Sequence, residues 1–283
     1  MPLGVHTSIA GGLSKAIDRA LELGCDCVQM FARNPRSWVY RPLDPAEAAL
    51  FRKRKKETGI YPVAVHTNYL VNLCTPDSVN FDKSLFLFKK ELSTAEEIGA
   101  DYLVTHLGSP MDMGSEFAIT RVLSAFRDFA GDGLGKKTTV LLENTSGAGS
   151  AFGSGLKDIS RIIEGAKALG LDIGLCFDTC HAFAAGYALK AGGAKALLSV
   201  IDKEIGLERL KLIHLNDSKG RFSSRLDRHE HIGKGQIGLE AFRELLTRPE
   251  IIRVPMILET PKKTAEDDPR NLKTVRKILS NIA

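Results

Sequence analysis

Eight short apolar segments recur along the chain, separated by longer segments in which apolar residues repeat every three or four positions. The short segments have the length of β-strands and are rich in β-branched or aromatic residues. They cover residues 3–9, 27–32, 61–67, 102–108, 139–145, 173–179, 210–217 and 255–260. Amphipathic helices are predicted between them, over residues 12–24, 82–99, 156–170, 192–206 and 238–246.

This alternation predicts an α/β fold, and eight strands separated by helices predict a closed TIM (β/α)8 barrel. An open doubly wound sheet is the alternative. No linker or low-complexity segment divides the 283 residues, so we expect one domain over residues 1–283. Asp82 is the expected capping residue of the helix that ends at Gly99.

Six of the eight apolar segments carry, near their C-terminal ends, a residue that can bind a metal. These residues are His66, His106, Glu143, Asp178, His214 and Glu259. Side chains two apart share one face of a strand, and the residues two positions earlier are apolar or carry a thiol. They are Ala64, Val104, Leu141, Cys176, Leu212 and Ile257. In a barrel the six polar groups would converge at one mouth, where metal ions would satisfy them.

Three more residues of the same kind lie close to these strand ends or in a polar loop. His181 follows Asp178 by three residues, and Asp227 and His229 lie in the segment 218–233. None of the seven histidines falls in a predicted helix, and only His6 and His231 are left over. Five histidines with four carboxylates suit two or three ions, with zinc favoured and manganese or iron possible. Clustered divalent ions favour hydrolysis of a phosphoester.

The five cysteines do not form a metal-binding pattern of their own. Their odd number and the length of the chain argue against a disulfide scaffold, so we expect reduced thiols in a cytoplasmic protein. Cys176 should pack below the barrel mouth, and Cys180 has no second thiol partner. The sequence contains no run of about 18 apolar residues, so no membrane span is expected. The N-terminus lacks the features of a signal peptide.

The net charge of +5 permits an anionic partner such as nucleic acid but is weak evidence for one. The densest basic run, residues 52–56, is interpreted mainly as a solvated helix face, with phosphate contact as the alternative. The glycine-rich segment 147–155 lacks the spacing of a phosphate-binding motif and is expected to be a loop.

Several motifs together resemble those of the endonuclease IV family, the zinc-dependent apurinic/apyrimidinic endonucleases. The motifs are HTSIAGGL at 6–13, LENT at 142–145, GLCFDTCH at 174–181, IHLNDSK at 213–219 and DRHEHIGKGQIG at 227–238. The resemblance extends over essentially the whole chain, and the motifs occur in the family's order.

This resemblance implies a TIM barrel that holds three zinc ions, with Mn2+ as a possible substitute. One ion would be bound by His66, His106 and Glu143. A second would share Glu143 as a bridge and add Asp178, His214 and Glu259, and the third would use His181, Asp227 and His229. The implied catalytic residues are Glu143 and Glu259, the latter as a group that orients the nucleophile.

The resemblance also implies the reaction. Such enzymes cut double-stranded DNA 5′ to an abasic site and leave a 3′-hydroxyl and a 5′-deoxyribose phosphate, with a metal-bridging hydroxide as nucleophile. Arg36, Tyr69 and Leu70 match the family's DNA-contacting positions. Without the resemblance, Tyr69 and Leu70 would be expected to cap the core. A monomer in the cytoplasm, acting in base excision repair, is expected.

The sequence departs from the family pattern at Leu107, Ala148 and Ala188, none of which is a predicted ligand. His231 could compete with His229 as a ligand, although the Asp-x-His match favours His229. His6 is expected to line the site or to support a ligand. The alternative functions are a metal-dependent sugar isomerase or epimerase on a related barrel and a non-catalytic protein that binds damaged DNA.

Overall fold

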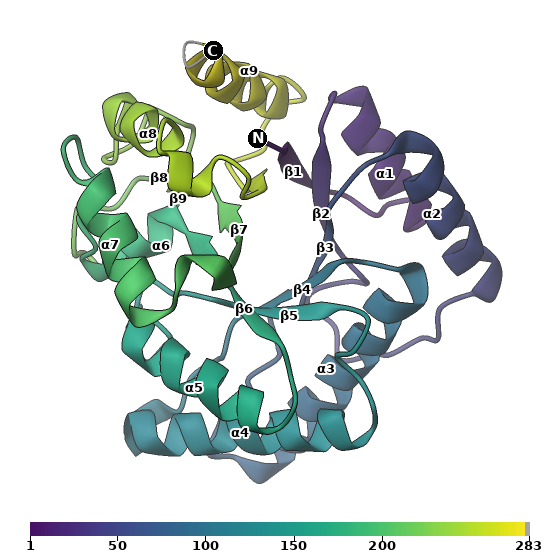
Figure 1. Cartoon of the computed structure of the whole chain (residues 1–283). Helices are drawn as coiled ribbons and strands as arrows, with labels where there is room; N and C mark the ends of the chain where they lie inside the picture. Colours follow the sequence, from purple (N-terminus) through teal and green to yellow (C-terminus); the bar gives the residue numbers. More distant parts are fainter. Residues whose placement is uncertain (281–283) are drawn as a thin grey trace.

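Eight parallel strands form a closed barrel in the computed structural model, which describes residues 1–280 (Figure 1). Their order around the ring is β1-β10-β7-β6-β5-β4-β3-β2. The strands are β1 (Leu3–Thr7), β2 (Cys27–Phe31), β3 (Val63–His66), β4 (Tyr102–Thr105), β5 (Thr139–Glu143), β6 (Ile173–Asp178), β7 (Leu210–His214) and β10 (Met256–Leu258). The predicted (β/α)8 barrel is therefore confirmed, and the open sheet is excluded because β1 pairs with both β2 and β10.

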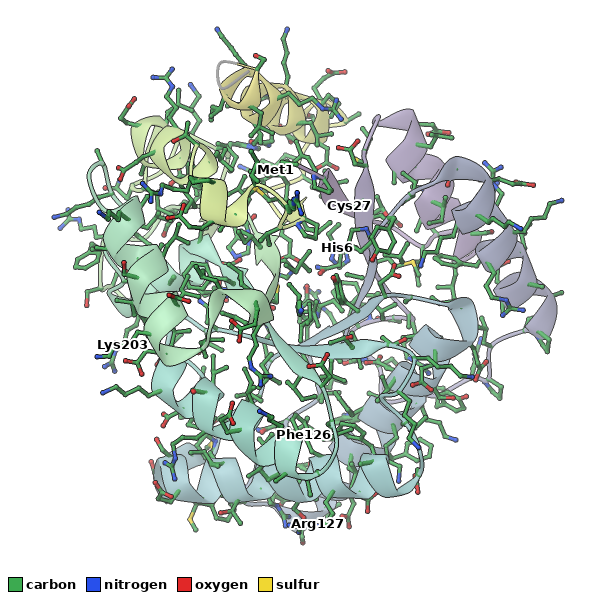
Figure 2. The ribbon with its side chains drawn as sticks, in the orientation of Figure 1. Met1, His6, Cys27, Phe126, Arg127 and Lys203 are labelled. Atoms are coloured by element: carbon green, nitrogen blue, oxygen red, sulfur yellow. The ribbon has the colours of Figure 1, made fainter. Side chains whose placement is uncertain are left out.

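The helices surround the barrel on its outside (Figure 1). They are α1 (Ser14–Glu22), α2 (Pro45–Thr58), α3 (Ser78–Ile98), α4 (Gly114–Gly131), α5 (Leu156–Ala168), α6 (Thr179–Ala185), α7 (Ala194–Glu204), α8 (Leu239–Leu246) and α9 (Asp267–Leu279). Figure 2 shows Phe126 on the side of α4 that faces the barrel and Arg127 on its outer side. No helix within residues 1–280 is long and apolar enough to cross a membrane.

The inside of the barrel is filled by a separate small cluster of buried side chains. It consists of Cys27, Ala64, Val104, Leu141, Cys176, Leu212 and Ile257. Six of these are the residues predicted to pack directly below the polar strand ends. One packed layer of side chains thus lies inside the barrel, and the next inward-facing residue of each strand, two positions later, lies at the mouth.

Some predicted element boundaries were wrong. The helix of residues 82–99 begins at Ser78, and Asp77 caps it by accepting the Asn80 backbone N–H at 2.7 Å. Asp82 lies inside this helix and is exposed. Helices α4, α6 and α9 were not predicted, and α6 contains His181.

The basic run at residues 52–56 lies on α2 and ties this helix to its neighbours. Arg54 pairs with Asp18 at 2.6 Å, and Lys55 pairs with Asp101 at 2.7 Å. These pairs agree with the interpretation of the run as a helix face.

Candidate metal centre

The six predicted strand-end residues meet at one mouth of the barrel. His66, Glu143, Asp178 and His214 are the last residues of β3, β5, β6 and β7. His106 and Glu259 directly follow β4 and β10. Parallel strands in a barrel present their carboxyl ends on the same side, and this geometry brings together residues up to 193 positions apart, as His66 and Glu259 are.

The nine predicted residues fall into three groups whose ligand atoms lie within 4.8 Å of one another. The groups are His66, His106 and Glu143; Glu143, Asp178, His214 and Glu259; and His181, Asp227 and His229. These are the three sets that the family resemblance implies, with Glu143 common to two of them.

Glu143 lies at the centre of the cluster and is fully buried. Its Oε2 is 3.1 Å from Nε2 of His66 and 3.3 Å from Nε2 of His106. Its Oε1 is 3.0 Å from Nδ1 of His214 and 3.3 Å from Nδ1 of His181. Burial alone would raise the pKa of the Glu143 carboxyl, but positive charge on His106 and His214 would lower it well below its ordinary value.

Three of the histidines are held by backbone carbonyl groups. Nδ1 lies 2.8 Å from the Thr67 oxygen in His66, 3.0 Å from the Asn144 oxygen in His181, and 3.0 Å from the Glu259 oxygen in His229. A carbonyl oxygen only accepts, so each Nδ1 carries the hydrogen and each Nε2 of a neutral ring presents a lone pair.

Those lone pairs face carboxylate oxygens, which is unfavourable unless the ring is protonated or a cation lies between the two groups. Nε2 of His66 is 3.1 Å from Glu143, and Nε2 of His181 is 3.3 Å from Asp227. Nε2 of His229 is buried and has no hydrogen-bond partner among residues 1–280. This donor set therefore fits divalent metal ions, which neutral imidazole and carboxylate bind together.

Asp178 and His181 are joined by the start of α6. Oδ1 of Asp178 accepts the His181 backbone N–H at 2.6 Å and so caps this helix. Oδ2 of Asp178 accepts the Asn216 side-chain N–H at 2.7 Å. For His181, burial would lower the pKa, but Asp178, Asp227 and Glu143 raise it well above its ordinary value.

Asp227 and His229 reach the mouth on a segment that a small antiparallel ladder holds in place. β8 (Asp217–Ser218) pairs with β9 (His229–Glu230), so His229 lies in a short strand rather than in a loop. The fully buried Asp217 carboxylate accepts four backbone N–H groups of this segment. The donors are Ser218 at 2.8 Å, Gly233 at 2.9 Å, Gly235 at 3.0 Å and Ile237 at 3.0 Å.

The sequence did not single out Asp217 or Gln29, although both are fully buried and polar. Gln29 is the inward-facing polar residue of β2 near the mouth, where six of the other strands end in or are directly followed by a predicted ligand. It contacts His6, His214 and Glu259. The sequence feature that could have identified Gln29 is its position as a polar residue inside the apolar run CVQMF. His6 lines the site beside Gln29, as expected.

Of the three predicted DNA-contacting residues, Tyr69 lines an open pocket beside the cluster, and Arg36 and Leu70 directly follow the lining residues Pro35 and Tyr69. Tyr69 is 59% exposed, Arg36 is exposed and Leu70 is half-buried. The exposure of Tyr69 contradicts the alternative that it caps the core. Its ring packs against Phe31 at 5.2 Å, and both line a pocket of about 710 Å³ that also includes Glu259.

The thiols are all free and buried. Cys176 packs inside the barrel, as predicted. Cys180 has no thiol partner, yet its sulfur lies within 4.8 Å of ligand atoms of Asp178 and His229, a proximity that the sequence did not predict. Burial raises the pKa of Cys180 to about 12, so the thiol is protonated at neutral pH when no metal binds it.

His231 points away from the three groups. Its Nδ1 accepts an N–H from Asn271 at 2.9 Å, and its Nε2 lies 3.8 Å from Asp267. Both partners belong to α9, so His231 is held outside the cluster.

The three departures from the family pattern also lie outside the cluster. Leu107 is part of the hydrophobic core, and Ala148 and Ala188 are exposed.

Known proteins similar to this chain share its length and its fold. A family model described as a xylose isomerase-like TIM barrel matches residues 17–281. A protein named probable endonuclease 4 from Methanoculleus marisnigri is 44% identical over 277 residues, with 98% of each chain covered. The crystal structure of endonuclease IV from Thermus thermophilus is 35% identical with a TM-score of 0.89, covering 99% of this chain and 100% of that one.

A D-tagatose 3-epimerase-like protein has a TM-score of 0.73 at 18% identity, covering 100% of this chain and 98% of that one. At that identity the likeness concerns the fold alone.

Proposed function

Because the chain is an enzyme of the endonuclease IV family, we propose that it hydrolyses the DNA backbone 5′ to abasic sites in base excision repair. The products would be a 3′-hydroxyl and a 5′-deoxyribose phosphate. The observation that carries the proposal is the set of nine histidines and carboxylates gathered in three groups at the barrel mouth, two of which, His229 and Glu259, line the adjoining pocket.

The proposal assigns three zinc ions to these groups, with Mn2+ as a possible substitute. Zinc would supply an acidified water and a positive field for the charge that develops on the phosphate. The buried Glu143 carboxylate would be shared by two groups, and its four histidine neighbours would hold it in place.

Glu259 is the second proposed catalytic residue. It is the carboxylate of its group that lines the open pocket, so it can reach both the ions and a substrate. Its Oε1 accepts an N–H from Gln29, which leaves Oε2 directed toward His214 at 3.2 Å. We assign Glu259 the orientation of the attacking water.

Arg36, Tyr69 and Leu70 are the proposed DNA contacts. Both Tyr69 and Arg36 are exposed, and Tyr69 lines the pocket. The backbone N–H of Tyr69 donates to the oxygen of Pro35 at 3.1 Å, which joins the two loops that carry these residues. An exposed aromatic ring beside an apolar side chain can replace the stacking lost at an abasic nucleotide, while arginine can pair with phosphate.

The alternative activity of a sugar isomerase or epimerase has fold similarity as its main support. The group formed by His181, Asp227 and His229 favours the nuclease, because a sugar isomerase needs only one or two ions at this mouth. Three bound ions per chain would support the nuclease, and one would contradict it.

The test is incision of a duplex with a single abasic site, with metal analysis of the same protein sample. We expect cleavage 5′ to the site, loss of cleavage after chelation and recovery with zinc. An undamaged duplex of the same sequence is the control. Absence of cleavage by zinc-loaded protein would overturn the proposal. The proposal includes action as a monomer in the cytoplasm, and light scattering would check the monomer.

A further inference from the structure

Gln29 is a fully buried polar side chain in the middle of the otherwise apolar strand β2. β2 does not end in a predicted ligand, but Gln29 occupies its inward-facing position at the mouth, in register with His6 of β1. Burying an amide away from water is costly unless its hydrogen bonds are made inside the protein. The partners of this amide therefore define its role.

The side chain of Gln29 has a partner for each of its polar atoms. Oε1 lies 2.8 Å from Nε2 of His214. Nε2 donates to Oε1 of Glu259 at 2.6 Å and lies 3.0 Å from Nδ1 of His6. One neutral side chain thus links β1, β7 and the end of β10 across the barrel mouth.

The chemistry of these partners fixes the orientation of the amide. The Glu259 carboxylate only accepts hydrogen bonds, so the NH2 group must face it, and the carbonyl oxygen must face His214. The reversed amide would place two oxygens at the 2.6 Å that separates Nε2 from Glu259. Consequently, Nε2 of His214 carries the hydrogen, and the lone pair of the neutral ring lies on Nδ1.

That lone pair is directed at two carboxylates. Nδ1 of His214 is 3.0 Å from Oε1 of Glu143 and 3.2 Å from Oε2 of Glu259. This arrangement presents Nδ1 as a metal ligand between two carboxylate ligands. In His66, His181 and His229 a backbone carbonyl oxygen accepts the ring N–H and leaves the other nitrogen free to bind a metal. In His214 the oxygen of a side chain, Gln29, has this role.

We propose that Gln29 is a positioning residue of the metal centre, which fixes the Nε2–H tautomer of His214 and the direction of the Glu259 carboxylate. The proposal rests on the metal-dependent function proposed above. Because Gln29 is uncharged, it orients both ligands without changing the charge of the centre. Groups that orient ligands in this manner change metal affinity by about 10- to 100-fold when they are removed.

Two substitutions separate the two parts of this role. Gln29→Met keeps the approximate volume of the side chain but removes both the acceptor for His214 and the donor for Glu259. Gln29→Glu keeps an oxygen acceptor for His214 but places a second carboxylate oxygen against Glu259. Thr138→Val is the matched control, because it removes a buried hydrogen bond of 2.8 Å to the Ala100 oxygen near the other end of β5.

Zinc affinity is measured by competition with a chelator, and the histidine tautomers are read from the ring nitrogen resonances of zinc-loaded, 15N-labelled protein. For Gln29→Met, we expect the ion at the group containing His214 to bind about 10- to 100-fold more weakly. The His214 nitrogen signals should lose the pattern of a protonated Nε2 and a ligated Nδ1. Thr138→Val should change neither measurement.

For Gln29→Glu, the His214 pattern should be retained, while kcat for incision at saturating zinc falls and KM is unchanged. Thermal unfolding establishes that each variant is folded. A folded Gln29→Met that keeps its zinc affinity within about twofold and its His214 pattern would overturn the proposal, as would loss of that pattern in Gln29→Glu. If the wild-type protein bound zinc but did not incise DNA, the proposed function would fail while the affinity and tautomer measurements still tested Gln29.

Discussion

Replacing Asp217 with asparagine is expected to release the segment 218–237 from the barrel mouth while the barrel itself stays folded. This segment carries Asp227 and His229 of the third candidate metal group. Its backbone is attached to the mouth by the four N–H groups that the two oxygens of Asp217 accept. Each of the two oxygens accepts two of these N–H groups, so all four hydrogen bonds depend on both oxygens of the carboxylate.

The size of the effect follows from this count. Asparagine has one side-chain oxygen, so in either orientation two of the four N–H groups face an NH2 group. Each buried donor left without an acceptor costs about 1–3 kcal/mol, which weakens the closed segment by about 2–6 kcal/mol. Burial raises the pKa of Asp217 despite its four N–H partners, so removal of the buried charge offsets part of this loss.

We expect the segment to open without unfolding of the barrel, so that the substitution lowers only the free energy of this local opening. We therefore expect zinc content to fall from three to two ions per chain, and hydrogen exchange to become faster within residues 218–237. Asp101→Asn is the control, because Asp101 accepts the Val63 backbone N–H at 2.7 Å at the opposite end of the barrel. Unchanged zinc content and unchanged exchange in the Asp217 variant would refute the reasoning.

Four further outcomes are expected. Glu259→Gln should lower kcat by at least about 100-fold at saturating zinc; full incision in single-turnover assays would contradict its catalytic role. The Cys180→Ser variant should retain the full zinc content of the wild-type protein in elemental analysis, and loss of an ion would show that the Cys180 thiol is a metal ligand. Tyr69→Ala should weaken binding to an abasic duplex by about 1–3 kcal/mol in fluorescence anisotropy without changing zinc content; unchanged affinity would contradict the assigned contact. In chelated protein, the pKa values of His181 and His214 are raised above their ordinary value, so protonation of these rings stabilises the folded state. This contribution to the free energy of unfolding is fully present below about pH 6.5 and is lost as the pH rises through the pKa values of the folded protein. The melting temperature of chelated protein should therefore fall above about pH 6.5, whereas zinc should give its largest stabilisation there because protons compete with it; a chelated protein that becomes more stable with rising pH would contradict this.

Much of the candidate centre could be predicted from the sequence because strands have a period of two. A polar residue at a strand end, with an apolar residue two positions earlier, indicates the inward face and its height in the barrel. Ala64, Leu141 and Cys176 lie in the inner layer for this reason, directly below His66, Glu143 and Asp178.

Helix boundaries were less predictable because a capping residue acts through a single local bond. Asp77 and Asp82 are both aspartates near the start of the same periodic segment, and the sequence pattern does not distinguish them. The structure selects Asp77, whose side chain accepts the Asn80 backbone N–H. The helical position of His181 was missed because α6 has only seven residues.

The sequence by itself determined the number of barrel strands and the residue types at the barrel mouth, since both follow from local periodicity. Only the tertiary structure decided which nitrogen of each histidine faces a carboxylate, and which neutral groups hold the rings. Gln29 and His214 are 185 residues apart, on strands β2 and β7, which β1 and β10 separate in the ring. Their contact depends on the closure of the barrel, which no local pattern contains.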